Sequence, residues 1–103
     1  MYRQGDVLIA PHDGETEATE EHPRDARGRV ILAAGEATGH HHAIRSKHAR
    51  LYATATAGLM VLEALRRVTL RHEEHAPIVL PPGKYLVRRQ REYIREGERW
   101  VAD

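Results

Sequence analysis

The sequence contains no cysteine and no phenylalanine, and each absence excludes a class of explanation. Without cysteine there are no disulfides, thiolate zinc sites, iron–sulfur clusters or cysteine nucleophiles. Any metal ion must therefore be held by histidine, carboxylate, carbonyl or water. Aromatic residues are also scarce, with four tyrosines and one tryptophan. Valine, leucine, isoleucine and alanine must therefore form the hydrophobic core.

Long apolar runs and a strong net charge are missing as well. No segment approaches the roughly 20 apolar residues that span a bilayer, and no basic-then-apolar secretion signal opens the chain. We therefore expect a cytoplasmic protein with no membrane partner. The formal net charge is only +1, which lacks the strong basic footprint of many nucleic-acid-binding domains.

Three motifs of familiar enzymes are absent too. The chain has no phosphate-cradling P-loop and no dinucleotide-binding glycine fingerprint. None of its serines or threonines lies in a nucleophile elbow. We therefore do not expect nucleotide-fuelled chemistry or serine hydrolysis.

Short apolar or alternating segments, separated by glycine and proline, predict strands. We expect a buried strand over the apolar run at 7–10, entered through Gly5-Asp6. Further strands are expected at residues 30–34, 40–45, 51–56, 59–63, 66–72, 77–80 and 85–94, with a last short pairing at 100–101. This pattern indicates one all-β domain over residues 1–103, built as a small antiparallel barrel or a two-sheet sandwich. Prolines aside, segment 11–29 has no apolar side chain larger than alanine. We expect it to be an exposed, mobile loop with solvated His12 and His22.

Residues 59–75 carry two competing patterns. Leucines recur there at helical spacing, whereas β-branched residues and a polar–apolar alternation favour strands. We expect two strands, at 59–63 and 66–72, and a helix is the alternative. On the strand interpretation Leu70 and His72 face inward.

A histidine run, His40-His41-His42, is the strongest functional signal in the chain. On an extended strand, alternation puts His40 and His42 on one face and His41 on the other. Further along the chain, the segment HEEH at 72–75 offers two more imidazoles and two carboxylates. Histidine is the commonest protein metal ligand, and a site needs three or four donors.

We therefore expect a divalent metal ion with four ligands: His40, His42, His72 and His75. Zinc is the first candidate, and iron, manganese and nickel are alternatives. Glu73 or Glu74 would complete the ligand shell or act as general base on a metal-bound water. Such a site suits a metal-dependent hydrolase, but the residues identify no substrate, small-molecule partner or reaction. The competing interpretation is that these histidines merely bond to backbone or solvent.

A second constellation combines arginines and tyrosines: Arg88, Arg89, Arg91, Tyr85 and Tyr93. A strand with these side chains can contact phosphates and stack bases. The alternative function is therefore a non-catalytic binding or assembly module, associated with a phage or an operon, that contacts a protein or nucleic acid. The competing interpretation is a solvated strand whose arginines form ion pairs with nearby glutamates and bind no partner. Exposed sheet edges would also permit homo-oligomers.

Two resemblances add to these expectations. The HxH pattern at 40–42 with the turn at 81–83 resembles a cupin, a double-stranded β-helix, and implies that HxH is a metal-binding pair. The chain lacks the cupin glutamate shortly after His42 and the histidine after Gly83. The strings YRQGDVL, GEATGHHHAI and HEEHAPIVLPPGKYLVRRQREY together resemble a family of small uncharacterised bacterial and phage proteins, which implies no activity.

Overall fold

The computed structural model describes residues 1–12, 14, 16–35, 39–94 and 99–102. This part of the chain is all-β, as expected, and contains no helix. Its strands are β1 (Tyr2–Gln4), β2 (Val7–Pro11), β3 (Ala18–Glu21), β4 (Val30–Ala34), β5 (His41–Ile44), β6 (Ala49–Thr54), β7 (Met60–Ala64), β8 (Val68–Arg71), β9 (Ile78–Leu80), β10 (Gly83–Arg89), β11 (Arg91–Ile94) and β12 (Arg99–Ala102). Since no helix is described, none that is long and apolar enough to cross a membrane occurs among these residues.

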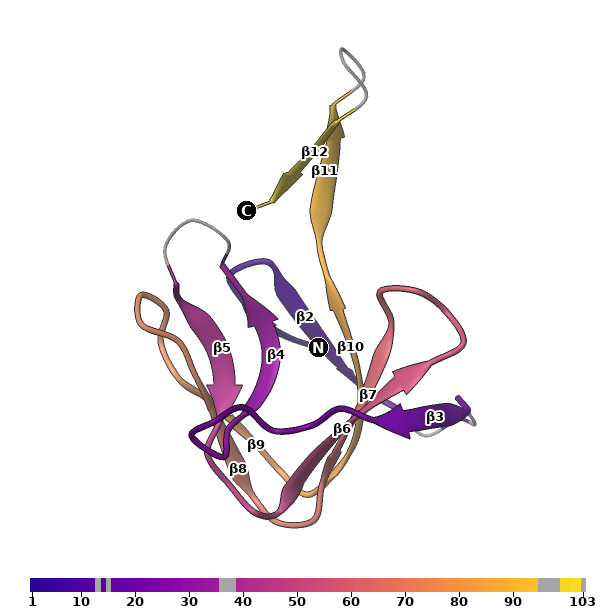
Figure 1. Ribbon diagram of the computed structural model, residues 1–103, viewed down its shortest axis with the longest axis vertical. Coiled ribbons are helices and arrows are strands. Elements are labelled where there is room, and N and C mark those ends of the chain that lie inside the picture. The colour runs from indigo at the N-terminus through magenta and orange to yellow at the C-terminus, as the bar shows by residue number, and fades with distance from the viewer. Residues whose placement is uncertain (13, 15, 36–38, 95–98, 103) are drawn as a thin grey trace.

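Two antiparallel sheets make up the body of the domain (Figure 1). One has six strands in the order β1-β2-β10-β7-β6-β3, and the other has four in the order β4-β5-β8-β9. In the described part of the chain these sheets do not close into a barrel, so the sandwich is the better of the two expected architectures. A third sheet, of β11 and β12 alone, extends away from the body (Figure 1).

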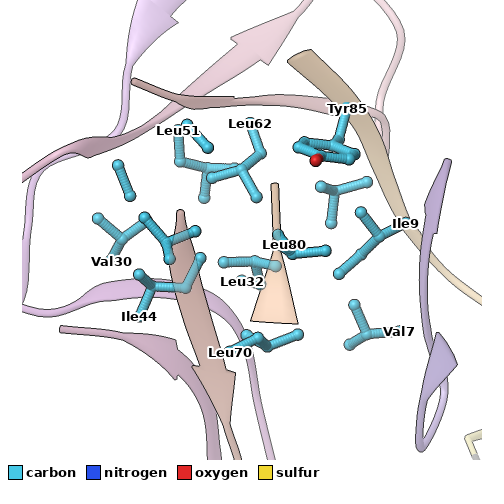
Figure 2. Close-up of a cluster of buried hydrophobic side chains, with 14 of the residues drawn as sticks. Val7, Ile9, Val30, Leu32, Ile44, Leu51, Leu62, Leu70, Leu80 and Tyr85 are labelled. Carbon is cyan, nitrogen blue, oxygen red and sulfur yellow. The ribbon is translucent and has the colours of Figure 1, made fainter. Parts of the chain in front are cut away.

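The hydrophobic core lies where side chains of the two sheets meet (Figure 2). Val7 and Leu62 come from the six-stranded sheet, and Ile44, Leu70 and Leu80 come from the four-stranded one. Along β2 and β8 buried and less buried residues alternate, because successive side chains of a strand point to opposite faces. The aliphatic core inferred from the scarcity of aromatics is therefore confirmed.

The region 59–75 forms strands and not a helix, as its alternation predicted. β7 and β8 lie in different sheets, and the turn between them carries the chain from one sheet to the other. Val68 and Leu70 are buried on the inward face of β8. On the neighbouring β5, His42 and Ile44 are buried in the same way.

The N-terminal segment contains the strand expected after Gly5-Asp6, as β2, and also a strand before it, β1, that was not expected. It is a hairpin, because β1 and β2 pair from Tyr2↔Ile9 to Gln4↔Val7 and leave only Gly5 and Asp6 in the turn. Gly5 has a φ of 59°, a left-handed conformation that glycine adopts without steric cost. The turn brings two buried polar residues, Gln4 and Asp6, to one end of the sandwich.

Two further expectations need correction. The segment 11–29 is not all loop, because it contains β3, which pairs with β6 while its four residues stay exposed. Because β3 pairs through its backbone while its side chains stay exposed, its sequence has no apolar alternation that would predict a strand. The strand expected at 85–94 is divided into β10 and β11. β10 pairs with β2 as far as Arg89, which lies opposite Val7 at the start of β2, and β11 pairs with β12 instead.

Candidate metal centre

Four histidine rings gather at the end of the sandwich where β5 begins and β8 ends. We call His40, His42, His72 and His75 the histidine cluster. Ring centroids are 4.2 Å apart for His42 and His72, 4.7 Å for His72 and His75, and 5.5 Å for His40 and His72. The structure thus brings together all four residues that the sequence nominated as metal ligands.

Antiparallel pairing explains why the two histidine segments meet. Ala43 of β5 lies opposite Arg71 of β8, so the start of one strand is next to the end of the other (Figure 1). The segment that follows Arg71 therefore begins beside His42. Its two histidines reach the cluster from the loop that connects β8 to β9.

His42 is the buried member of the cluster, with 5% of its surface exposed. Its Nδ1 lies 2.8 Å from Oε1 of Gln4. The Gln4 amide nitrogen donates to the carbonyls of Leu70 and Ala76 at 3.1 and 3.0 Å, which leaves the amide oxygen to accept from His42. His42 therefore carries its proton on Nδ1, and its Nε2 has a free lone pair.

The free Nε2 of His42 faces a buried carboxylate. Oδ1 of Asp6 is 3.7 Å away, and Oδ2 of Asp6 accepts a hydrogen bond from Arg89 Nε at 2.9 Å. Burial lowers the pKa of His42 to about 4, and the neighbouring His72 acts in the same direction, while Asp6 opposes the shift. The imidazole is therefore neutral at physiological pH, which is the protonation state that binds metal ions.

His72 is held by a backbone contact. Its Nδ1 accepts a hydrogen bond from the Glu74 N–H at 3.0 Å, so a neutral His72 carries its proton on Nε2. Burial lowers the pKa of His72, and His75 acts in the same direction. Coordination through either ring nitrogen would end the bond to Glu74. Nδ1 would give its lone pair to the metal, and Nε2 could coordinate only after its proton had moved to Nδ1.

The two expected acid–base residues differ in position. Glu73 Oε1 accepts a hydrogen bond from the His41 backbone N–H at 2.8 Å, which lowers the pKa of Glu73. One ligand atom each from His40, His72 and Glu73 lie within 4.8 Å of one another. Both carboxylates are exposed, and Glu74 Oε1 lies 3.5 Å from His40 Nδ1. Glu73 differs from Glu74 in that it has a ligand atom near two histidines of the cluster at once.

The β1–β2 turn packs directly against two rings of the cluster. A Cβ atom added at Gly5 would lie 2.8 Å from Nε2 of His75 and 3.3 Å from Cε1 of His42. Gly5, Gln4 and Asp6 are thus parts of the site that the sequence analysis missed. The available signal was the Gly-Asp pair itself, because a two-residue turn of this type predicts a hairpin whose flanking residues point the same way.

A family model described as a domain of unknown function (DUF8820) matches residues 3–90. The chain belongs to this family. The matched range of the DUF8820 domain includes the β1–β2 turn and both histidine segments, and it ends before β11. The expectation of an uncharacterised family is confirmed. No curated protein and no solved structure matches the chain.

The arginine–tyrosine constellation of the DUF8820 domain is divided by the fold. Tyr85 is buried in the core and its hydroxyl donates to the Pro81 carbonyl, so its ring is not available to stack on a base. Arg89 is bonded to Asp6, whereas Arg88 is exposed. The side chains of Arg91 and Tyr93 lie outside the described residues.

Proposed function

We propose that this domain binds one divalent transition-metal ion through the histidine cluster, with zinc as the first candidate. The observation that carries the proposal is the convergence of four imidazole rings from two separate segments, with Glu73 beside them. Chance encounters of surface histidines do not explain a buried member whose tautomer is fixed by a buried glutamine. In known metal sites a hydrogen bond to the ring nitrogen that does not bind the metal orients the histidine, and Gln4 makes such a bond to His42 Nδ1.

The geometry around His42 supports the proposal. Zinc binds nitrogen and carboxylate oxygen at about 2.1 Å, so two ligands of one ion lie at most about 4.2 Å apart. The 3.7 Å between His42 Nε2 and Asp6 Oδ1 meets this condition. Asp6 therefore joins the candidate ligands, in addition to the four histidines and Glu73.

Hydrolysis is the chemistry that such a centre would serve. A metal ion bound by three protein ligands can keep a water molecule in an open position and lower its pKa to about 7. Glu73, ionised and close to the cluster, is better placed than Glu74 to accept the proton of that water. The HxH pair resembles the metal-binding pair of a cupin. The other two imidazoles, however, come from the loop before the 81–83 turn, whereas a cupin has its further histidine after that turn.

The test is elemental analysis of untagged protein purified without chelators or added metal. We expect close to one metal ion per chain in the native protein and very little in His40→Asn/His72→Asn, which alters only half-buried residues. His12→Asn/His22→Asn is the matched control, because it removes two histidines outside the cluster, and it should keep the metal. Absence of metal from the native protein, or equal metal in both variants, would refute the proposal.

A further inference from the structure

A pocket lies on the outward face of the four-stranded sheet, behind the buried faces of β5 and β8. Ile31, Ala43 and Arg71 form one row across β4, β5 and β8. Alternation puts Arg29, His41 and Arg45 on the same face. The pocket has a volume of about 340 Å³, and its lining residues are Arg29, His41, Ala43, Arg45, Arg71, His72 and Glu73.

Positive charge dominates this pocket. Arg29 is paired with Asp25, at 2.8 Å between Nε and Oδ2. Arg45 and Arg71 are exposed and have no ion-pair partner among the described residues. Ala43 lies between them in the sheet, and its small side chain leaves space where a larger one would fill the pocket. Two unpaired guanidinium groups around a cavity are a recognition site for an oxyanion.

We propose that this arginine pocket binds the phosphate group of a small molecule. Arg45 and Arg71 offer two positive charges to a phosphate dianion, and the guanidinium fork fits two phosphate oxygens at once. The carboxylate of Glu73 on the pocket wall opposes them with one negative charge, part of which is taken up by its bond to the His41 N–H. The volume of about 340 Å³ lies within the range of small-molecule sites. His72 and Glu73 line the pocket and also belong to the candidate metal centre, so the phosphate would lie beside the ion. The pocket thus indicates that the substrate of the proposed centre carries a phosphate group. This link to catalysis rests on the proposed function, whereas phosphate binding itself does not.

The test is calorimetric titration with inorganic phosphate at low ionic strength, on protein as purified and on protein stripped with a chelator. We expect Arg45→Gln/Arg71→Gln to weaken phosphate binding at least about tenfold in both states, because two charge-assisted contacts are lost. Arg66→Gln/Arg67→Gln is the matched control. It makes the same change of charge on two exposed arginines of the β7–β8 turn, outside the pocket, and it should leave the affinity unchanged.

Three results would overturn the inference: equal phosphate affinity in the two variants, no binding to the native protein at about 10 mM phosphate, or tighter binding of succinate than of phosphate. Metal content of the same samples separates this inference from the proposed function. Arginine-dependent phosphate binding by a protein that takes up no metal would uphold the pocket and refute the metal centre. Metal uptake without phosphate binding would do the reverse.

Discussion

The histidine cluster has a buried half and an open half, and they are held in different ways. His42 is fixed by Gln4 on one nitrogen and faces Asp6 with the other, and all three residues are at least 95% buried. His72 and His75 belong to a connecting loop, and the bond that fixes His72 comes from the backbone of Glu74. One half is therefore preorganised, and the other can rearrange around a ligand.

This difference indicates that the two halves of the cluster have different roles in metal binding. A ligand whose tautomer and orientation are set before the metal binds loses little entropy on binding. Removal of the groups that orient it lowers the metal affinity. The open half contains Glu73 and Glu74 and adjoins the arginine pocket, so exchange of water and substrate would take place there. Matched changes in the two halves should therefore have different effects.

Replacement of Gln4 should have the largest effect, because its amide makes two buried hydrogen bonds and a third that is partly buried. In Gln4→Met the His42 Nδ1–H and the carbonyls of Leu70 and Ala76 lose their partner, which should lower the free energy of unfolding by on the order of 4 kcal/mol. Metal affinity should fall about 10- to 100-fold. Denaturant unfolding and metal titration measure the two effects. Gln90→Met, at an exposed position, should change neither, and an equal loss in both variants would contradict the assignment.

The next largest effect is expected in the pH dependence of stability, which depends on His42 in the buried half. The pKa of His42 is about 4 in the folded protein against 6.5 for the free side chain. As pH falls below 6.5 the unfolded chain binds a proton that folded His42 does not, so stability falls until about pH 4 and then levels off. The loss from this residue should reach about 3 kcal/mol.

The groups that face His42 are His72, His75, Asp6 and Arg89. The lowered pKa of His72 has the same sign and should add to the loss. The measurement is the free energy of unfolding of chelator-treated protein between pH 4 and 8. In His42→Gln the slope below pH 6.5 should be shallower, and an unchanged slope would show that other groups cause it.

Sequence reasoning succeeded where local pattern decides the structure. β4 occupies residues 30–34 as its apolar run predicted, and alternation on β5 correctly put His42 on the buried face. It failed where a partner distant in sequence decides. Gln4 can be buried because the carbonyls of Leu70 and Ala76 accept hydrogen bonds from its amide. Asp6 can be buried because Arg89 donates a hydrogen bond to its carboxylate. The Gly-Asp pair predicts the hairpin, but nothing in the local pattern shows that Gln4 and Asp6 would be buried.

The close approach of the turn to the cluster can be tested at Gly5. Gly5→Ala would strain a φ of 59° and place a Cβ atom 2.8 Å from His75 Nε2. Gly58 is the matched control, because its φ is 79° and no atom lies within 4 Å of an added Cβ. The left-handed φ should cost each alanine variant roughly 1–2 kcal/mol of unfolding free energy, and Gly5→Ala should lose more because its Cβ atom also displaces the His75 ring. Only Gly5→Ala should also weaken metal binding, and equal metal affinity in the two would place His75 outside the site.

The subtlest expected change is a single hydrogen bond in the open half. Because metal binding through either nitrogen of His72 removes its bond to the Glu74 N–H, the amide resonance of Glu74 should move strongly when zinc is added to ¹⁵N-labelled protein. The His41 amide, bonded to Glu73, provides an internal comparison. If Glu73 serves as the base its bond to His41 persists and that resonance moves little, whereas a Glu73 that becomes a ligand shifts both. A Glu74 amide that stays in place at metal saturation would remove His72 from the ligand set and leave the buried half as the centre of the site.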